Sequence, residues 1–340
     1  MSSNATKDII AIGGSAGSRA VLKTLFADLP ADLPASIFVS THIPANSPSL
    51  LPAILADSSS LPVRQAVDGQ PIERGHIYVA APDRHLLLMG ETIKLGAGPR
   101  ENMVRPSIDP MFRSAALSFG PRAVGIVLTG MLNDGAAGLH AIKSHGGTTV
   151  VQHPLDAEAD QMPLAALEAV EIDHVASAAE LGGLLVKIAG SEAGPVPDVP
   201  SDDLRLEVEI AAGDRLGSAA LGKIASPSVL TCPDCHGVLS EVRGSRPLRF
   251  RCQIGHAYTA DVLAGHTDEL DEAIRIAMRI MEERLTLVER MARDARATGR
   301  KAVAELYEAR AAEYRQYSAT LRDAALSSLR HGRASPFQDI

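Results

Sequence analysis

The sequence lacks any apolar run near the eighteen or so residues that a membrane-spanning helix needs. Its start, Met-Ser-Ser-Asn-Ala-Thr-Lys-Asp, also lacks the basic and apolar regions of a secretory signal peptide. Basic residues are too few for a global basic surface, because 41 acidic side chains face 33 basic ones and the net charge is −8. We therefore expect a cytoplasmic protein that neither inserts into a membrane nor binds nucleic acid.

Cysteine is scarce, with three residues in 340, all between positions 232 and 252. An odd number in so compact a cluster favours a metal site over disulfides. Cys232 and Cys235 form a C-x₂-C pair, and Cys252 and His256 follow after sixteen residues as a C-x₃-H pair. Three thiolates and one imidazole suit tetrahedral zinc, and four protein ligands leave no open position for water. We predict a structural zinc site; the alternative is three buried or free thiols.

What the chain does contain, over residues 7–190, is a regular alternation of short apolar runs and amphipathic stretches. This alternation predicts a Rossmann-like α/β fold, a doubly wound, mostly parallel sheet with helices on both faces. Helices are expected around residues 22–26, 107–117, 136–143 and 164–169. The expected strands are Ile9–Ile12, Ser36–Val39, Ile77–Ala80, Ala123–Thr129, Thr148–Val151 and His174–Ala176.

The remaining sequence divides into three expected parts. Residues 191–229 are rich in Pro, Gly, Ser and Asp and are expected to be a linker, with an alternating patch from Leu204 to Ile210 that could form an edge strand. Residues 230–262 carry the metal ligands and are expected to form a small zinc-ribbon-like module. Residues 266–330 repeat apolar side chains at helical spacing around a break near Gly299, which predicts a helical hairpin.

Two features of this second half leave alternatives open. The leucine and methionine stripe of the helical hairpin either forms an intramolecular core or docks onto a partner protein. The arginines between the two ligand pairs either contact phosphates or acidic partners or belong to a solvated hairpin; they are Arg243, Arg246, Arg249 and Arg251.

Ser15 lies in a glycine-rich turn, Gly13 to Gly17, directly after the first apolar run. Such a turn lifts a serine hydroxyl out of a strand-to-helix junction, and the amides that follow point toward it as anion donors. The same kind of turn also binds phosphates or simply packs in doubly wound folds. No Lys-Ser/Thr pair directly follows the turn, and this absence favours a nucleophile.

A serine nucleophile needs a histidine as base and a carboxylate that orients it. In a parallel sheet such partners must follow strand ends, because all strands end at the same edge. His42, one of eleven histidines, follows the end of the expected strand Ser36–Val39. Asp134 follows the run that starts at Ala123, although an aspartate before a helix is commonly an N-cap. The pattern predicts that Ser15, His42 and Asp134 act together.

Residues 7–190 resemble the catalytic domain of the chemotaxis protein-glutamate methylesterase family, the CheB type. The resemblance implies a Ser15, His42, Asp134 triad, an oxyanion held by the amides of Ala16 and Met131, and hydrolysis of glutamate γ-methyl esters on methylated chemoreceptors without a catalytic cofactor. It rests on five segments in order, Ile12–Gly17, Thr41–Pro44, Ile77–His85, Arg105–Ala116 and Leu128–Ala136, with Met162 and Pro163 ahead of a helix.

Two residues depart from the family pattern. Ala16 replaces a small hydroxyl residue after the nucleophile, and Leu132 stands where the family usually has glycine. A leucine with positive φ is strained by about 1–2 kcal/mol, so the oxyanion amide could shift if the turn needs that conformation. Arg105 and Ser107 are candidates to line the approach to Ser15, although Arg105 could equally be a surface ion-pair residue.

Alternative functions also stay open. Deamidation of receptor glutamines would use the same nucleophile on an amide. A weakly active or inactive esterase scaffold would instead act as a signalling interaction module through its zinc ribbon and helices, with a receptor, a sensory kinase or a response regulator as partner. The expected sheet begins within ten residues of the N-terminus, without room for the receiver domain that commonly precedes and inhibits this esterase domain. We therefore expect control by the C-terminal module or by a separate chain.

Overall fold

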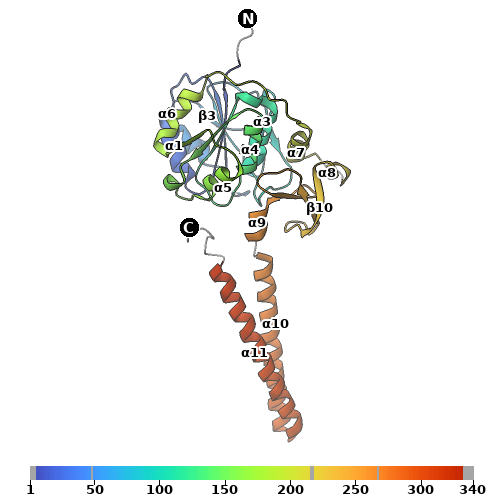
Figure 1. The fold of residues 1–340 in the computed structure, drawn as a ribbon. Helices are drawn as coiled ribbons and strands as arrows, with labels where there is room; N and C mark the ends of the chain where they lie inside the picture. The colour runs from blue at the N-terminus through green and yellow to red at the C-terminus, as the bar shows by residue number, and fades with distance from the viewer. Residues whose placement is uncertain (1–4, 47–48, 215–217, 266–267, 332–340) are drawn as a thin grey trace. The chain divides into compact units, whose positions relative to one another are not determined.

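The computed structural model describes residues 5–46, 49–214, 218–265 and 268–331. The chain forms two compact units, Met1–Val262 and Leu263–Ile340 (Figure 1). None of the helices in the described ranges is both long and apolar enough to cross a membrane.

A seven-stranded sheet forms the centre of the first unit, and all its neighbouring strands pair in parallel. The predicted Rossmann-like architecture is confirmed, with β3 as a strand that periodicity did not reveal. In spatial order the strands are β3 (Val63–Gln65), β4 (Ile77–Val79), β2 (Ser36–Thr41), β1 (Ile9–Gly14), β7 (Ala123–Val127), β8 (Thr148–Gln152) and β9 (His174–Ala176).

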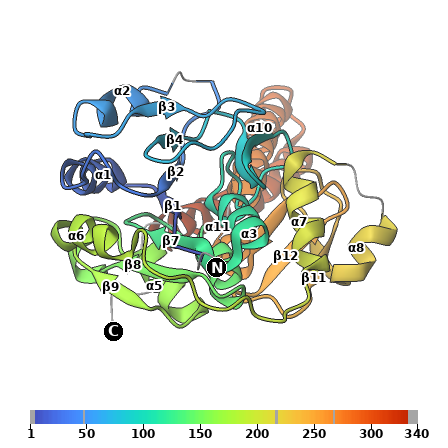
Figure 2. The same cartoon turned by 90° about the horizontal axis from the view of Figure 1, so that it is seen from above.

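Helices cover both faces of this sheet (Figure 2). Side chains alternate across a strand, and in β1 Ile10 and Ile12 enter one core while Ile9 and Ala11 enter the other. This double burial explains why the strand is apolar throughout. The first core includes side chains of α1 (Ser18–Ala27) and α6 (Ala178–Ile188), and the second those of α3 (Ile108–Phe119), α4 (Ala136–Ser144) and α5 (Gln161–Ala169).

The order of the strands places a topological switch point between β1 and β7. From β1 the chain proceeds to β2 on one side, and it later returns to β7 on the other side of β1. Ligands in doubly wound sheets bind in the crevice that forms outside the strand ends at such a point. The loops after β1 and β7, which carry Ser15 and Asp134, therefore share the place where this fold usually has its site.

Shorter elements complete this part, namely α2 (Leu51–Ala56), the hairpin β5 (His85–Met89) and β6 (Thr92–Gly96), and the 3-10 turns Gly120–Arg122 and Pro154–Asp156.

Most of the described residues of the expected linker over 191–229 belong to helices or a strand; residues 215–217 lie outside the described ranges. It contains α7 (Asp202–Ala212), α8 (Ser218–Ile224) and β10 (Ala225–Thr231), so the irregular described residues are 191–201, 213 and 214. The patch from Leu204 to Ile210 is therefore helix and not an edge strand. Its buried side chains include Val208 and Ala211, a helical spacing of three, and α7 packs against α3.

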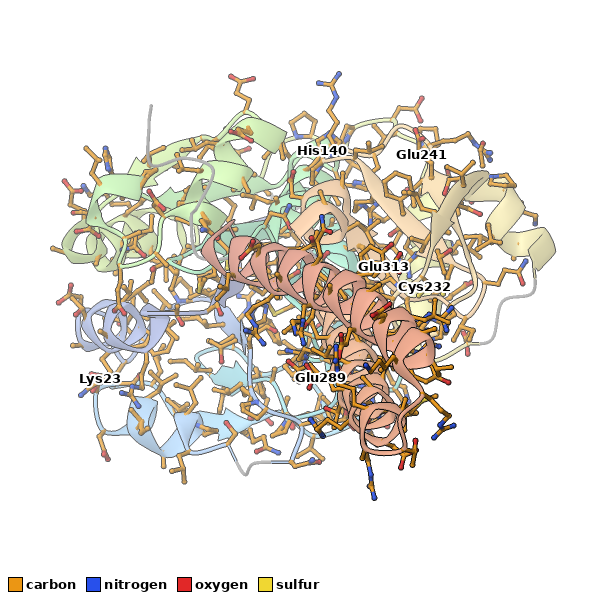
Figure 3. All side chains as sticks on the ribbon, turned by 90° about the horizontal axis from the view of Figure 1, so that it is seen from below. Lys23, His140, Cys232, Glu241, Glu289 and Glu313 are labelled. Atoms are coloured by element: carbon orange, nitrogen blue, oxygen red, sulfur yellow. The ribbon has the colours of Figure 1, made fainter. Side chains whose placement is uncertain are left out.

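A second, antiparallel sheet follows, which we call the ribbon sheet. Cys232, labelled in Figure 3, comes directly after β10. The short helix α9 (Ala260–Gly265) follows the sheet. The strands lie in the order β10, β11 (Val238–Val242), β12 (Arg249–Cys252) and β13 (Ala257–Thr259).

The second unit is a helical hairpin, as the spacing of its apolar residues predicts. It consists of α10 (Asp268–Ala297) and α11 (Lys301–His331), which pack against each other. Residues 266 and 267 of the expected range lie outside the described part of the chain. Gly299 has a φ of 76°, which suits the turn between the helices.

Candidate active site and metal centre

Ser15 lies in the turn between β1 and α1. Its amide donates to the carbonyl of Thr129 at 2.9 Å, which ties the turn to the loop after β7. Gly17 caps α1 with a φ of 77°, a conformation that glycine adopts without strain. A Cβ on Gly130 would lie 2.9 Å from Cβ of Ser15, so a glycine is needed for these two loops to approach each other.

His42 and Asp134 come together across 92 positions of sequence. Nε2 of His42 lies 2.8 Å from Oδ2 of Asp134. The histidine side chain is 22% exposed and the aspartate only 2%, so the imidazole reaches the surface while its carboxylate is enclosed. The other imidazole nitrogen, Nδ1, is then available as a base.

Asp134 is not the N-cap of α4. That position is Gly135, and no side chain caps the helix there. The Asp134 carboxylate instead faces the start of α3, where it accepts hydrogen bonds from the Ile108 amide and the Ser107 hydroxyl, each at 2.8 Å. Burial by itself would raise the pKa of Asp134. The hydrogen bond and the charge of His42, together with the hydrogen bonds from Ile108 and Ser107, outweigh burial and lower the pKa.

A second buried carboxyl group lies beside this one. Burial, followed by the negative charge of Asp134, raises the pKa of Asp109. Nδ2 of Asn102 donates to both groups, at 3.3 Å from Asp109 Oδ2 and 3.4 Å from Asp134 Oδ1. Sequence reasoning missed Asn102, since no local pattern marks an asparagine that bridges two carboxyls from a distant loop.

The amides of Ala16 and Met131 are suited to the predicted oxyanion role. Within the described ranges, neither amide donates to an acceptor. The neighbouring amides are occupied, since that of Ser15 donates to Thr129 and that of Leu132 to Oε1 of Gln161 at 2.8 Å. The two predicted donors thus remain available for a developing negative charge.

Leu132 does adopt the strained conformation that the family's glycine would allow, with a φ of 63°. We expect Leu132→Gly to raise the free energy of unfolding by about 0.5–1 kcal/mol, because relief of strain exceeds the added freedom of the unfolded chain. Urea unfolding measures the difference. Met131→Gly is the control, because Met131 is similarly exposed and lacks positive φ, and it should destabilise. A Leu132→Gly protein less stable than the parent would contradict this account.

The two predicted approach residues lie in different environments. Ser107 is fully buried and holds Asp134, so it cannot line the path to Ser15. Arg105 makes an ion pair with Asp83, with Nη2 at 2.6 Å from Oδ1, and also donates to the carbonyls of Ala97 and Gly98. These contacts favour the ion-pair alternative for Arg105, and a role in substrate binding stays a prediction.

The four predicted metal ligands converge. Their ligand atoms, from Cys232, Cys235, Cys252 and His256, all lie within 4.8 Å of one another. Sγ of Cys235 is 3.6 Å from that of Cys252, close to the separation of about 3.8 Å for two thiolates on one zinc ion. Burial, followed by the neighbouring Cys232, raises the pKa of the Cys252 thiol to about 12. A bound cation would favour the thiolate there, so the donor set fits zinc.

Two of the ribbon arginines are not solvated. Arg249 is 8% exposed and Arg251 is fully buried, which overturns both alternatives drawn from the sequence for these two. Arg249 donates to the two carboxylate oxygens of Glu207 at 2.7 and 2.8 Å. Charged residues that a sequence suggests are exposed can be buried when a distant helix supplies the opposite charge, as α7 does here.

Comparison with known proteins agrees with this geometry. The model of the CheB methylesterase family matches residues 10–185. A putative protein-glutamate methylesterase/protein-glutamine glutaminase of Leptospira interrogans serogroup Icterohaemorrhagiae serovar copenhageni is 37% identical over 53% of this chain and 94% of that protein. Protein-glutamate methylesterase/protein-glutamine glutaminase 4 of Anaeromyxobacter dehalogenans is 34% identical over 56% of this chain and 54% of its own length. The Thermotoga maritima CheB methylesterase catalytic domain matches with a TM-score of 0.53 and 29% identity, over 54% of this chain and 100% of that domain. The chain therefore belongs to the CheB methylesterase family.

Proposed function

We propose that this protein is a protein-glutamate methylesterase that hydrolyses glutamate γ-methyl esters on chemoreceptor-type proteins, with Ser15, His42 and Asp134 as its triad. The contact between His42 and Asp134, beside the Ser15 turn at the switch point of the sheet, carries the proposal. The reaction needs no catalytic cofactor, because the nucleophile, base and oxyanion donors are all protein groups.

The chemistry follows from these positions. His42 takes the hydroxyl proton as Oγ of Ser15 attacks the γ-carbonyl carbon of the ester. Asp134 stabilises the imidazolium, and the amides of Ala16 and Met131 donate to the oxyanion. The intermediate collapses when its C–O bond to the methoxy group breaks and His42 returns the proton to the departing methanol. Water, activated by the same imidazole, then cleaves the acyl-enzyme and restores both Ser15 and a glutamate side chain.

Methanol release from methylated chemoreceptor tests the proposal. Ammonia release from receptor glutamines, measured in parallel, tests the related glutaminase activity that the names of both relatives include. A fluorophosphonate probe reports on Ser15 without any receptor. Failure of the probe to label Ser15 in native protein, together with no methanol release, would overturn the esterase and favour the interaction-module alternative. A sensory kinase or response regulator as partner stays a prediction.

We also propose that Cys232, Cys235, Cys252 and His256 hold a structural zinc ion. Four protein ligands would complete its coordination, so it would stabilise the ribbon sheet and take no part in the reaction. None of the three cysteines forms a disulfide, and closely spaced cysteines without disulfides are typical of a reducing compartment. This supports the cytoplasm as the proposed location.

Purified full-length protein is expected to contain about one zinc ion per chain, measured by atomic emission. Cys235→Ser should lose most of this zinc and lower the melting temperature of the ribbon-containing unit, because metal binding contributes to folding. His236→Asn is the control; its residue follows Cys235, has a φ of 58° that asparagine tolerates, and is not one of the four ligands. Zinc-free wild-type protein, or full zinc content in Cys235→Ser, would contradict the proposal.

A further inference from the structure

The ribbon sheet is in direct contact with Asn102, which in turn contacts the catalytic acid. The Asn102 amide donates to the Ala257 carbonyl at 2.7 Å, and its side-chain Oδ1 accepts from the Thr259 amide at 3.1 Å. Strand β13 thus fixes both the backbone and the side chain of this residue. Nδ2 of the same side chain reaches Asp134 and Asp109. Asn102 therefore connects the ribbon sheet to Asp134.

A second connection reaches the residue before Asp134. The Thr259 hydroxyl donates to Oδ1 of Asn133 at 2.8 Å, and Nδ2 of Asn133 donates to Asp261 at 2.9 Å. Asn133 is 3% exposed and Thr259 is fully buried, so water cannot replace their bond. The ribbon side thus holds the backbone at Asp134 as well as its carboxylate.

Buried charges keep the ribbon sheet in place against the α/β sheet. Arg251, next to the metal ligand Cys252, donates to Glu101 and to Glu207, each at 3.0 Å. Burial opposes ionisation of Glu101, but Arg113 and Arg251 outweigh it and hold the pKa of Glu101 at about 2. Removing one partner of such a buried pair is costly, because the other charge is left uncompensated. The ribbon sheet is therefore anchored at Glu101, the residue directly before Asn102.

We propose that the ribbon sheet is a built-in part of the esterase site and that Thr259 and Asn102 are positioning residues for Asp134. The match to the family model ends at residue 185, so this support comes from outside the matched domain. Strand β13 starts directly after the predicted ligand His256, which links its register to the metal centre. The inference rests on the proposed esterase function.

The test compares Thr259→Val with Thr259→Ser in the full-length protein. Valine keeps the shape but removes the hydroxyl that holds Asn133, whereas serine retains it. We expect Thr259→Val to lower kcat for methanol release and the rate of fluorophosphonate labelling of Ser15 by about tenfold, with KM within about twofold. Thr259→Ser should restore both rates. Thr231→Val, on the exposed end of β10, is the matched control and should change neither.

Each outcome decides the proposal. Equal labelling of Thr259→Val and wild type would overturn it, as would a loss that serine does not restore. If the wild type itself is not labelled, the esterase function fails, which is a different result. If Thr259→Val does not fold, Asp261→Ala carries the test, because Asp261 is exposed and its loss only removes the acceptor for Asn133. That variant should label about threefold more slowly, and an unchanged rate would overturn the proposal.

Discussion

Ser15→Ala is expected to abolish methanol release, with a loss of about 10⁴-fold or more in kcat, because no other group in the mechanism can form the acyl-enzyme. The fold should be unaffected, since within the described ranges the Ser15 hydroxyl makes no hydrogen bond that the substitution would break. The measurement is the single-turnover rate with methylated chemoreceptor, together with the melting temperature. Methanol release within tenfold of wild type would exclude a serine mechanism.

Ser60→Ala is the matched control for this substitution. Ser60 is an exposed serine in the loop between α2 and β3 and belongs to none of the groups assigned to the site. Its substitution should leave both the rate and the melting temperature unchanged. A loss of labelling or of turnover in Ser60→Ala would reveal that this surface serine reacts.

Asp134→Asn is expected to lower kcat by about 10³–10⁴-fold while the protein still folds. Each carboxylate oxygen of Asp134 accepts at least two hydrogen bonds, from His42 and Ile108 at Oδ2 and from Ser107 and Asp109 at Oδ1. The amide NH₂ of asparagine would therefore face hydrogen-bond donors at either position. The His42 imidazole also loses its orientation and its countercharge. Steady-state kinetics with methylated chemoreceptor measure the effect.

Asp109→Asn is the comparison that separates two effects of Asp134→Asn. One effect is the lost orientation of the His42 imidazole, and the other is the loss of a buried carboxyl group. Asp109 is equally buried and lies beside Asp134, but its contacts are the Gly138 amide and Asn102, not His42. We expect at most about a tenfold loss in kcat for this variant. If both substitutions reduced kcat equally, general disturbance of the buried pair, and not the contact with His42, would explain the effect.

Local sequence patterns were sufficient to predict the α/β architecture. Strands such as β1 are buried on both faces, so their apolar runs stand out in the sequence, and the residues after them share one edge of the sheet. This reasoning placed His42 and Asp134 after strand ends, and the structure joins them at 2.8 Å. The spacing of the three cysteines and His256 likewise predicted a cluster, because the geometry of each ligand pair is set by a short local turn.

Contacts between distant segments decided the rest. The sequence alone could not separate a catalytic carboxylate from an N-cap at Asp134, nor show that Ser107 is buried, because both depend on how α3 meets the loop after β7. It also misassigned α7, where the buried Glu207 is paired with Arg249 and Arg251 of the ribbon sheet and with Arg113 of α3. Hydrophobic periodicity records which side chains avoid water, whereas pairing of buried polar groups is determined by the partner that the fold supplies.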